Sequence, residues 1–252
     1  MKTAINATLV LAAAMTLLPT VLTAAPEKAP AKEKAAESAA PAKDKPAAEA
    51  PADEGPTQAQ LKARKAKDPR GYRKADKALQ VAEAANQPIL MFILVDQTPA
   101  NPVSEFLEKK VLTNKLFKEL AKENVVLLKL KLKAEQMKGK EKPKKIDVKG
   151  LKAAEVKLVQ NFGLDEKANK QAMANGQPER TYMDLVNYPA VIGLSPDGTK
   201  CLFRMGRYDK DGGMGVWISE VADTLRSHGF EPVVTPLIQQ VLDNPDDKKW
   251  KK

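Results

Sequence analysis

The sequence predicts an α/β domain at about residues 72–230, with a central mixed sheet flanked by helices on both faces. Three observations lead to this fold class. The run "PILMFILV" at 88–95 is apolar throughout and of strand length, as expected for a strand buried on both sides. Amphipathic helical segments alternate with strands up to about residue 162, which favours parallel strands joined by helices. Two later strands flank the turn "SPDG", which predicts an antiparallel hairpin.

The first half of the domain supplies two adjacent parallel strands. Residues 72–87 have apolar residues at helical spacing and a stop signal at Asn86, so they precede the strand 88–95 as a helix. Residues 102–122 carry a broad apolar face, which predicts a helix that is broken near 113–114. The segment 124–133, "NVVLLKLKLK", begins apolar and ends alternating, so it is a strand that leaves the core as it proceeds. A helical crossover between the two strands makes them parallel.

The second half supplies the hairpin and closing helices. A helix is predicted at 151–162, and the polar, poorly periodic segment 165–187 follows it. The strand "YPAVIGLS" and its partner "KCLFRMGRY" form the hairpin. The last helix of the domain places five apolar residues on one face, namely Trp217, Ile218, Val221, Ala222 and Leu225. A shorter helix at 232–242 and a basic tail make up residues 231–252.

Two segments precede the domain. Residues 1–25 have a basic start, an apolar centre and a small-residue exit, which is typical of a cleavable secretory signal peptide, and an uncleaved N-terminal anchor is the alternative. Residues 26–70 are rich in Ala, Pro, Lys and Glu, and we expect a disordered, semi-extended linker. We therefore expect a periplasmic or secreted protein. Ordered structure is expected to start near Thr57 or Tyr72.

Composition excludes several kinds of site. The single cysteine, Cys201, cannot form a disulfide within the chain, and the single histidine, His228, leaves no two-histidine metal site. The net charge is +10, and ten lysines lie between Lys129 and Lys152 without arginine or aromatic residues, so the basic region does not have the composition of a nucleic-acid interface. A solvated loop is favoured there, and a weak contact with anionic envelope surfaces is the alternative.

Several local strings resemble those of the thioredoxin-like superfamily. "FLEKKVL" at 106–112 matches the residues that open the helix after the Cys-x-x-Cys pair of exported members. "NYPAV" matches the cis-proline loop, with Tyr188 and Pro189 at its centre, and "LSPDGTKCLFRMGRY" is similar to the hairpin that follows. The resemblance covers about 130 residues and implies a thioredoxin-like fold with insertions at about 133–150 and 165–187. It also implies a cis Tyr188–Pro189 bond.

The departures from this family decide the expected function. Counting back from "FLEKKVL" places the two cysteine positions at Asn101 and Ser104, neither of which carries sulfur. Thiol–disulfide exchange needs an attacking thiolate and a resolving thiol, so we expect no redox activity at this turn. Asn101 suits a helix N-cap, and Pro102 suits the first helical position. Cys201 lies in the hairpin, away from a helix N-terminus, and a buried, inert thiol is expected.

We accordingly expect an exported domain that binds a protein or peptide of the cell envelope, with no cofactor, no metal and no catalytic residue. The family's peptide groove implies the candidate binding residues, which are Asn101, Pro102, Val103, Ser104, Tyr188 and Pro189. Two alternatives stay open: a redox enzyme that uses Cys201 alone, and a structural protein attached to the envelope through its basic loop and tail. The sequence does not specify the partner, the oligomeric state or whether the segment 165–187 covers the altered turn.

Overall fold

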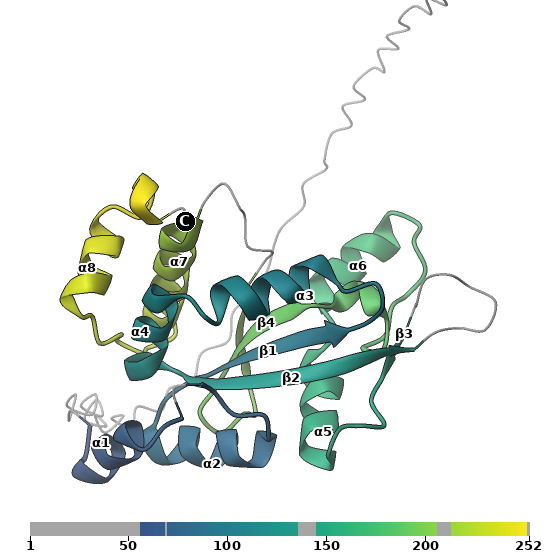
Figure 1. The fold of residues 1–252 in the computed structure, drawn as a ribbon. Coiled ribbons are helices and arrows are strands. Elements are labelled where there is room, and N and C mark those ends of the chain that lie inside the picture. The colour runs from purple at the N-terminus through teal and green to yellow at the C-terminus, as the bar shows by residue number, and fades with distance from the viewer. Residues whose placement is uncertain (1–55, 69, 136–144, 206–212, 251–252) are drawn as a thin grey trace, which may run out of the picture. The chain divides into compact units, whose positions relative to one another are not determined.

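The computed structural model describes residues 56–68, 70–135, 145–205 and 213–250, all of which belong to one compact unit, Asp53–Lys252. Its sheet has the order β3-β2-β1-β4-β5, and Figure 1 labels the first four of these strands. The strands are β1 (Ile89–Asp96), β2 (Val126–Glu135), β3 (Lys145–Asp147), β4 (Ala190–Leu194) and β5 (Cys201–Met205). β1 and β2 are parallel, and β4 and β5 continue the sheet in antiparallel fashion. The predicted mixed sheet, with its parallel pair and later hairpin, is confirmed.

Helices cover both faces of the sheet, as predicted. The helices are α1 (Gln58–Lys65), α2 (Ala75–Ala85), α3 (Pro102–Phe106), the π-helix η1 (Leu107–Val111), α4 (Lys115–Asn124), α5 (Ala153–Phe162), α6 (Glu166–Ala174), the 3₁₀ helix η2 (Leu185–Asn187), α7 (Gly213–Ser227), α8 (Pro236–Asp243) and the 3₁₀ helix η3 (Lys248–Trp250). α4, α7 and α8 share one core cluster, and α2 and α5 share the other. Figure 1 shows these two groups on opposite sides of β1 and β2.

β1 contributes to both cores because its side chains alternate across the sheet. Leu90, Phe92 and Leu94 belong to the cluster beneath α4 and α7, whereas Ile89 and Met91 belong to the cluster beneath α2. Each of these five side chains is buried. The continuous apolar run of the sequence is thereby explained, since neither face of this strand meets water.

The ordered part begins at the earlier of the two predicted starts, Thr57. α1 lies within the segment 26–70 that was expected to be a disordered linker, so that expectation is wrong for residues 58–65. Thr57 caps the helix by accepting a hydrogen bond from the Gln60 backbone N–H, and the Gln60 side chain accepts one from the Thr57 N–H. This reciprocal capping box stabilises a helix that buries no residue of its own. The predicted signal peptide and residues 26–55 of the linker lie outside the described residues.

The two predicted insertions contain regular structure. In the first, β2 runs to Glu135 and the short β3 pairs with it, while 136–144 lie outside the described residues. In the second, residues 166–174 form α6, a helix that the sequence pattern did not predict. Asp165 begins this helix by accepting a hydrogen bond from the Ala168 N–H at 3.0 Å. A helix can therefore form here although α6 buries only Asn169 and Ala172.

Candidate functional site

The turn after β1 is an ordinary capped helix start. The Asn101 side-chain oxygen accepts hydrogen bonds from the Val103 and Ser104 backbone N–H groups, each at 3.0 Å. Pro102 occupies the first turn of α3 and is exposed. Ser104 is 5% exposed, and its hydroxyl oxygen accepts a hydrogen bond from the Val95 N–H at 2.9 Å. Both positions that the sequence resemblance assigned to the cysteines therefore carry side chains that bond to nearby backbone N–H groups.

The loop before β4 has the expected cis Tyr188–Pro189 peptide bond, and a second cis bond joins Thr98 to Pro99. Tyr188 is buried, and its hydroxyl donates to the Tyr182 carbonyl at 2.6 Å. Burial raises the pKa of the Tyr188 hydroxyl above its ordinary value, so it stays a neutral donor. Its backbone N–H donates to the Leu185 carbonyl at 3.0 Å. The residue before the cis-proline thus has no free N–H with which to pair an added peptide strand.

A small pocket of about 170 Å³ lies between the turn and this loop. Of the six predicted site residues, Val103 and Pro189 line it, whereas Asn101, Pro102, Ser104 and Tyr188 do not. The complete lining is Val103, Leu107, Asp165, Ala168, Arg180, Val186, Asn187, Pro189, Ala190, Val191, Arg204, Met205 and Trp217. The pocket is therefore the place where α3, the cis-proline loop and the segment 165–187 meet.

Sequence reasoning missed the charged residues of this pocket. Arg180 follows α6, and its backbone N–H donates to the buried Asn169 side chain at 3.0 Å, which holds the loop against the helix. Arg204 comes from β5, and its guanidinium donates to the Phe162 carbonyl at the end of α5. Asp165 is the carboxylate among the lining residues. Two arginines against one carboxylate give the pocket an excess of positive charge. No local sequence motif indicates this grouping of charges.

The position of Cys201 corrects the expectation of a buried thiol, because this residue is exposed. β5 is the edge strand of the sheet, and the hairpin register shifts between Gly193 and Leu194, which pair with Phe203 and Cys201. The extra residue on β5 changes which face Cys201 presents. Partial desolvation raises the pKa of the thiol above its ordinary value. The thiol is thus accessible, but its surroundings disfavour the thiolate.

Among the described residues, no group of three His, Cys, Asp or Glu side chains is placed to hold a metal ion. Within the same part of the chain, no helix has the length and apolar character that crossing a membrane requires.

Comparison with known proteins assigns no family to the chain. No protein-family model matches the sequence. No curated protein matches it significantly. A solved structure described as "DsbH Oxidoreductase" is similar with a TM-score of 0.37 and 15% sequence identity, over 62% of this chain and 83% of that chain. The strand order, the parallel β1–β2 pair and the antiparallel β4–β5 hairpin agree with the thioredoxin-like fold that the sequence resemblance implies.

Proposed function

We propose that this protein is an exported thioredoxin-like module that binds a protein or peptide and carries out no thiol–disulfide exchange. One observation carries the proposal. Asn101 and Ser104 complete the local backbone bonding where redox relatives hold their cysteines, yet a pocket persists beside Val103 and Pro189. The signal-like residues 1–25 and the linker composition of the segment after them support export to the periplasm or beyond.

The chemistry of exchange has no candidate pair of thiols. A thiolate must attack a disulfide, and a second thiol must release the mixed disulfide. The chain has one cysteine, and the raised pKa of Cys201 leaves less of it as thiolate at neutral pH. We therefore propose binding, which requires no thiol.

The dimensions of the pocket favour recognition of one side chain. Small-molecule sites typically measure about 300–1,000 Å³. The pocket at the turn, at about 170 Å³, is smaller and has room for a side chain of a longer ligand. Because the Tyr188 N–H is already bonded to Leu185, strand addition at this loop offers fewer backbone contacts than in the family. Arg180 and Arg204 favour an acidic side chain in the pocket.

An insulin-reduction assay with a dithiol supply tests the absence of exchange. We expect the wild-type protein and Cys201→Ala to show the same background rate. The double variant Asn101→Cys/Ser104→Cys serves as a positive control, because it places two thiols at the start of α3, where the helix dipole favours a thiolate. Turnover by the wild type well above that of Cys201→Ala would reject the proposal.

Partner capture from the exported compartment tests the binding function. Arg180→Glu reverses one charge of the pocket, and Lys170→Glu makes the same change at an exposed position of α6 outside it. We expect Arg180→Glu to lower the recovery of partners by about tenfold, in line with the loss of a charge-assisted hydrogen bond, while Lys170→Glu leaves recovery unchanged. Equal recovery by the two variants would count against this pocket as the binding site.

A second candidate function is favoured by the exposure of Cys201, which makes a one-cysteine redox or peroxide-reactive site sterically accessible. The rate of alkylation against pH distinguishes it. Slow labelling that rises only above pH ~8.5, the ordinary pKa of a cysteine, removes this candidate, whereas fast labelling near neutral pH supports it.

A further inference from the structure

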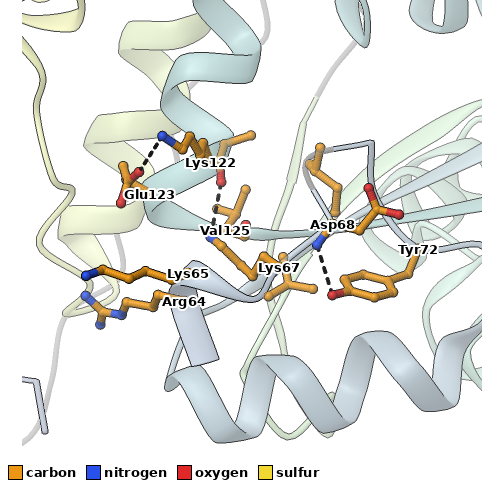
Figure 2. Close-up of a pocket in the computed structure, with 11 residues that line it drawn as sticks. Arg64, Lys65, Lys67, Asp68, Tyr72, Lys122, Glu123 and Val125 are labelled. Carbon is orange, nitrogen blue, oxygen red and sulfur yellow. Dashed lines mark hydrogen bonds and ion pairs between the residues drawn. The ribbon is translucent and has the colours of Figure 1, made fainter. Parts of the chain in front are cut away.

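A larger pocket lies away from the altered turn, between the N-terminal segment and the end of α4. Its volume is about 470 Å³, which is within the range of small-molecule sites. It is lined by Arg64, Lys65, Lys67, Asp68, Tyr72, Ala121, Lys122, Glu123, Val125, Val126 and Leu127. None of these residues lines the pocket beside the cis-proline loop. Figure 2 shows their side chains, which come from α1, the loop that follows it, the end of α4 and the start of β2.

Lys67 is the central polar group of this pocket. Its ammonium nitrogen donates to the carbonyls of Ala121 and Val125, at 3.4 and 3.1 Å. Figure 2 shows the side chain reaching from the α1–α2 loop to the end of α4. A lysine ammonium has three N–H donors, so one donor remains for a ligand after these two bonds. Burial lowers the Lys67 pKa to about 8, with Glu123 opposing the shift and Arg64 adding to it. An anion beside the ammonium would favour its charged form.

The remaining charges of the lining also favour an anion. Arg64, Lys65, Lys67 and Lys122 bring four positive charges, against the two carboxylates of Asp68 and Glu123. Lys122 and Glu123 form an exposed ion pair at 3.5 Å, so their two charges largely offset each other. The excess of two positive charges then comes from Arg64, Lys65 and Lys67 against Asp68.

The lining next to these charges is apolar. Ala121, Val125, Val126 and Leu127 are all buried, and the Tyr72 ring lies beside them. The Tyr72 hydroxyl accepts a hydrogen bond from the Asp68 N–H at 3.1 Å, which orients the ring (Figure 2). Such a site, with an apolar wall and a few placed cations, suits a ligand that has both an apolar body and an anionic group.

We propose that this pocket binds a small amphiphilic organic anion, with its carboxylate or phosphate against Lys67 and Lys122 and its apolar body against Val125, Val126 and Tyr72. The site is independent of the proposed peptide function, because it shares no residue with the pocket at the turn.

Titration of the ¹⁵N-labelled full chain with 4-phenylbutyrate, followed by NMR, tests the proposal. We expect saturable shifts of the Tyr72 and Glu123 amides. The uncharged 4-phenylbutyramide and inorganic phosphate should each bind about tenfold more weakly or worse, since the first lacks the charge and the second lacks the apolar body. Affinity for 4-phenylbutyrate should fall as the pH rises through about 8, where Lys67 loses its proton.

Two variants and a control separate binding from a structural role of Lys67. Lys67→Gln should weaken 4-phenylbutyrate binding about tenfold. Because Lys67 also bonds to the Ala121 and Val125 carbonyls, its loss could disturb the apolar lining at the end of α4. Lys122 makes no such backbone bond, so Lys122→Gln tests the charge by itself and should weaken binding severalfold. Lys118→Gln, one turn earlier on the same helix and outside the pocket, should bind like the wild type. Equal binding by the wild type and Lys122→Gln, or equal binding of 4-phenylbutyramide, would overturn the proposal.

Discussion

Ser104→Ala is the substitution that most directly tests the structural role of the altered turn. The Ser104 hydroxyl accepts the Val95 N–H at 2.9 Å, and both residues are buried. The last paired residues of β1 and β4 are Ile93 and Ala190, so β4 offers no partner at Val95. The hydroxyl of α3 therefore completes the hydrogen bonding of β1 where its neighbouring strand has ended.

The expected cost follows from the loss of this acceptor. A buried N–H that is left without a partner costs ~1–3 kcal/mol, and 3% exposure of Val95 gives water little access to its backbone. We expect Ser104→Ala to lower the free energy of unfolding by about 2 kcal/mol. Ser104→Cys should fall between the wild type and alanine, because sulfur is a weak acceptor.

Urea denaturation followed by tryptophan fluorescence measures this change. With a slope of ~2 kcal/mol per molar urea, the midpoint should fall by about 1 M at an unchanged slope. Ser227→Ala is the control, since this serine is exposed and its hydroxyl donates to the Thr224 carbonyl at the end of α7. If Ser104→Ala shifted the midpoint no further than Ser227→Ala, the hydroxyl would not be the group that satisfies Val95.

Two further predictions concern the ends of the ordered unit. Asn124→Ala should lower the free energy of unfolding by about 2 kcal/mol, because the buried Asn124 amide donates to the Leu120 and Val233 carbonyls at 2.9 and 3.0 Å. Thermal denaturation measures this loss, with Asn161→Ala at an exposed position as the control. Equal stability of the two variants would contradict the prediction. The pKa of Lys67 in the folded protein, about 8, lies below its usual 10.5. Between pH 8 and 10.5 the unfolded chain therefore binds more protons than the folded chain. The wild type should accordingly gain stability relative to Lys67→Met as the pH rises from about 8 to about 10. Because the pocket is open to water, we expect a gain of about 1 kcal/mol rather than the full ~3, and a difference that stays constant with pH would disprove the shift.

The fold was accessible from the sequence because its signals are local. β1 is apolar at every position from Ile89 to Val95, so its length and apolar composition alone predicted a central strand, and both cores contain its side chains. The break near 113–114 was also predicted, and Asn114 is indeed the N-cap of α4, accepting from the Leu116 N–H at 2.8 Å. These features depend on residues within one turn or one strand, where periodicity and capping are informative.

The helices that were missed have weak apolar patterns. α1 buries no residue, and α6 buries one polar and one small side chain. Both begin with a side-chain cap, at Thr57 and Asp165. The caps were legible in the sequence, whereas the periodicity that normally predicts a helix was absent. The exposure of Cys201 was missed for another reason. It depends on a bulge in the β4–β5 register that no residue type in the hairpin predicts.

The charged residues of both pockets could not be predicted, because each pocket is assembled from distant parts of the chain. At the pocket beside the cis-proline loop, Arg180 comes from a loop after α6 and Arg204 from the edge strand β5. At the larger pocket, Lys67 comes from the loop after α1 and bonds to Ala121, which lies 54 residues later in the chain. Only the packing of the helices against the sheet brings them together. Sequence resemblance to the thioredoxin-like superfamily pointed to the turn itself, but the structure assigns its polar side chains to the backbone. The charged side chains that line the pocket at this end of the sheet are Asp165, Arg180 and Arg204. The first two belong to the segment 165–187, an insertion that the resemblance does not cover, and the third comes from β5.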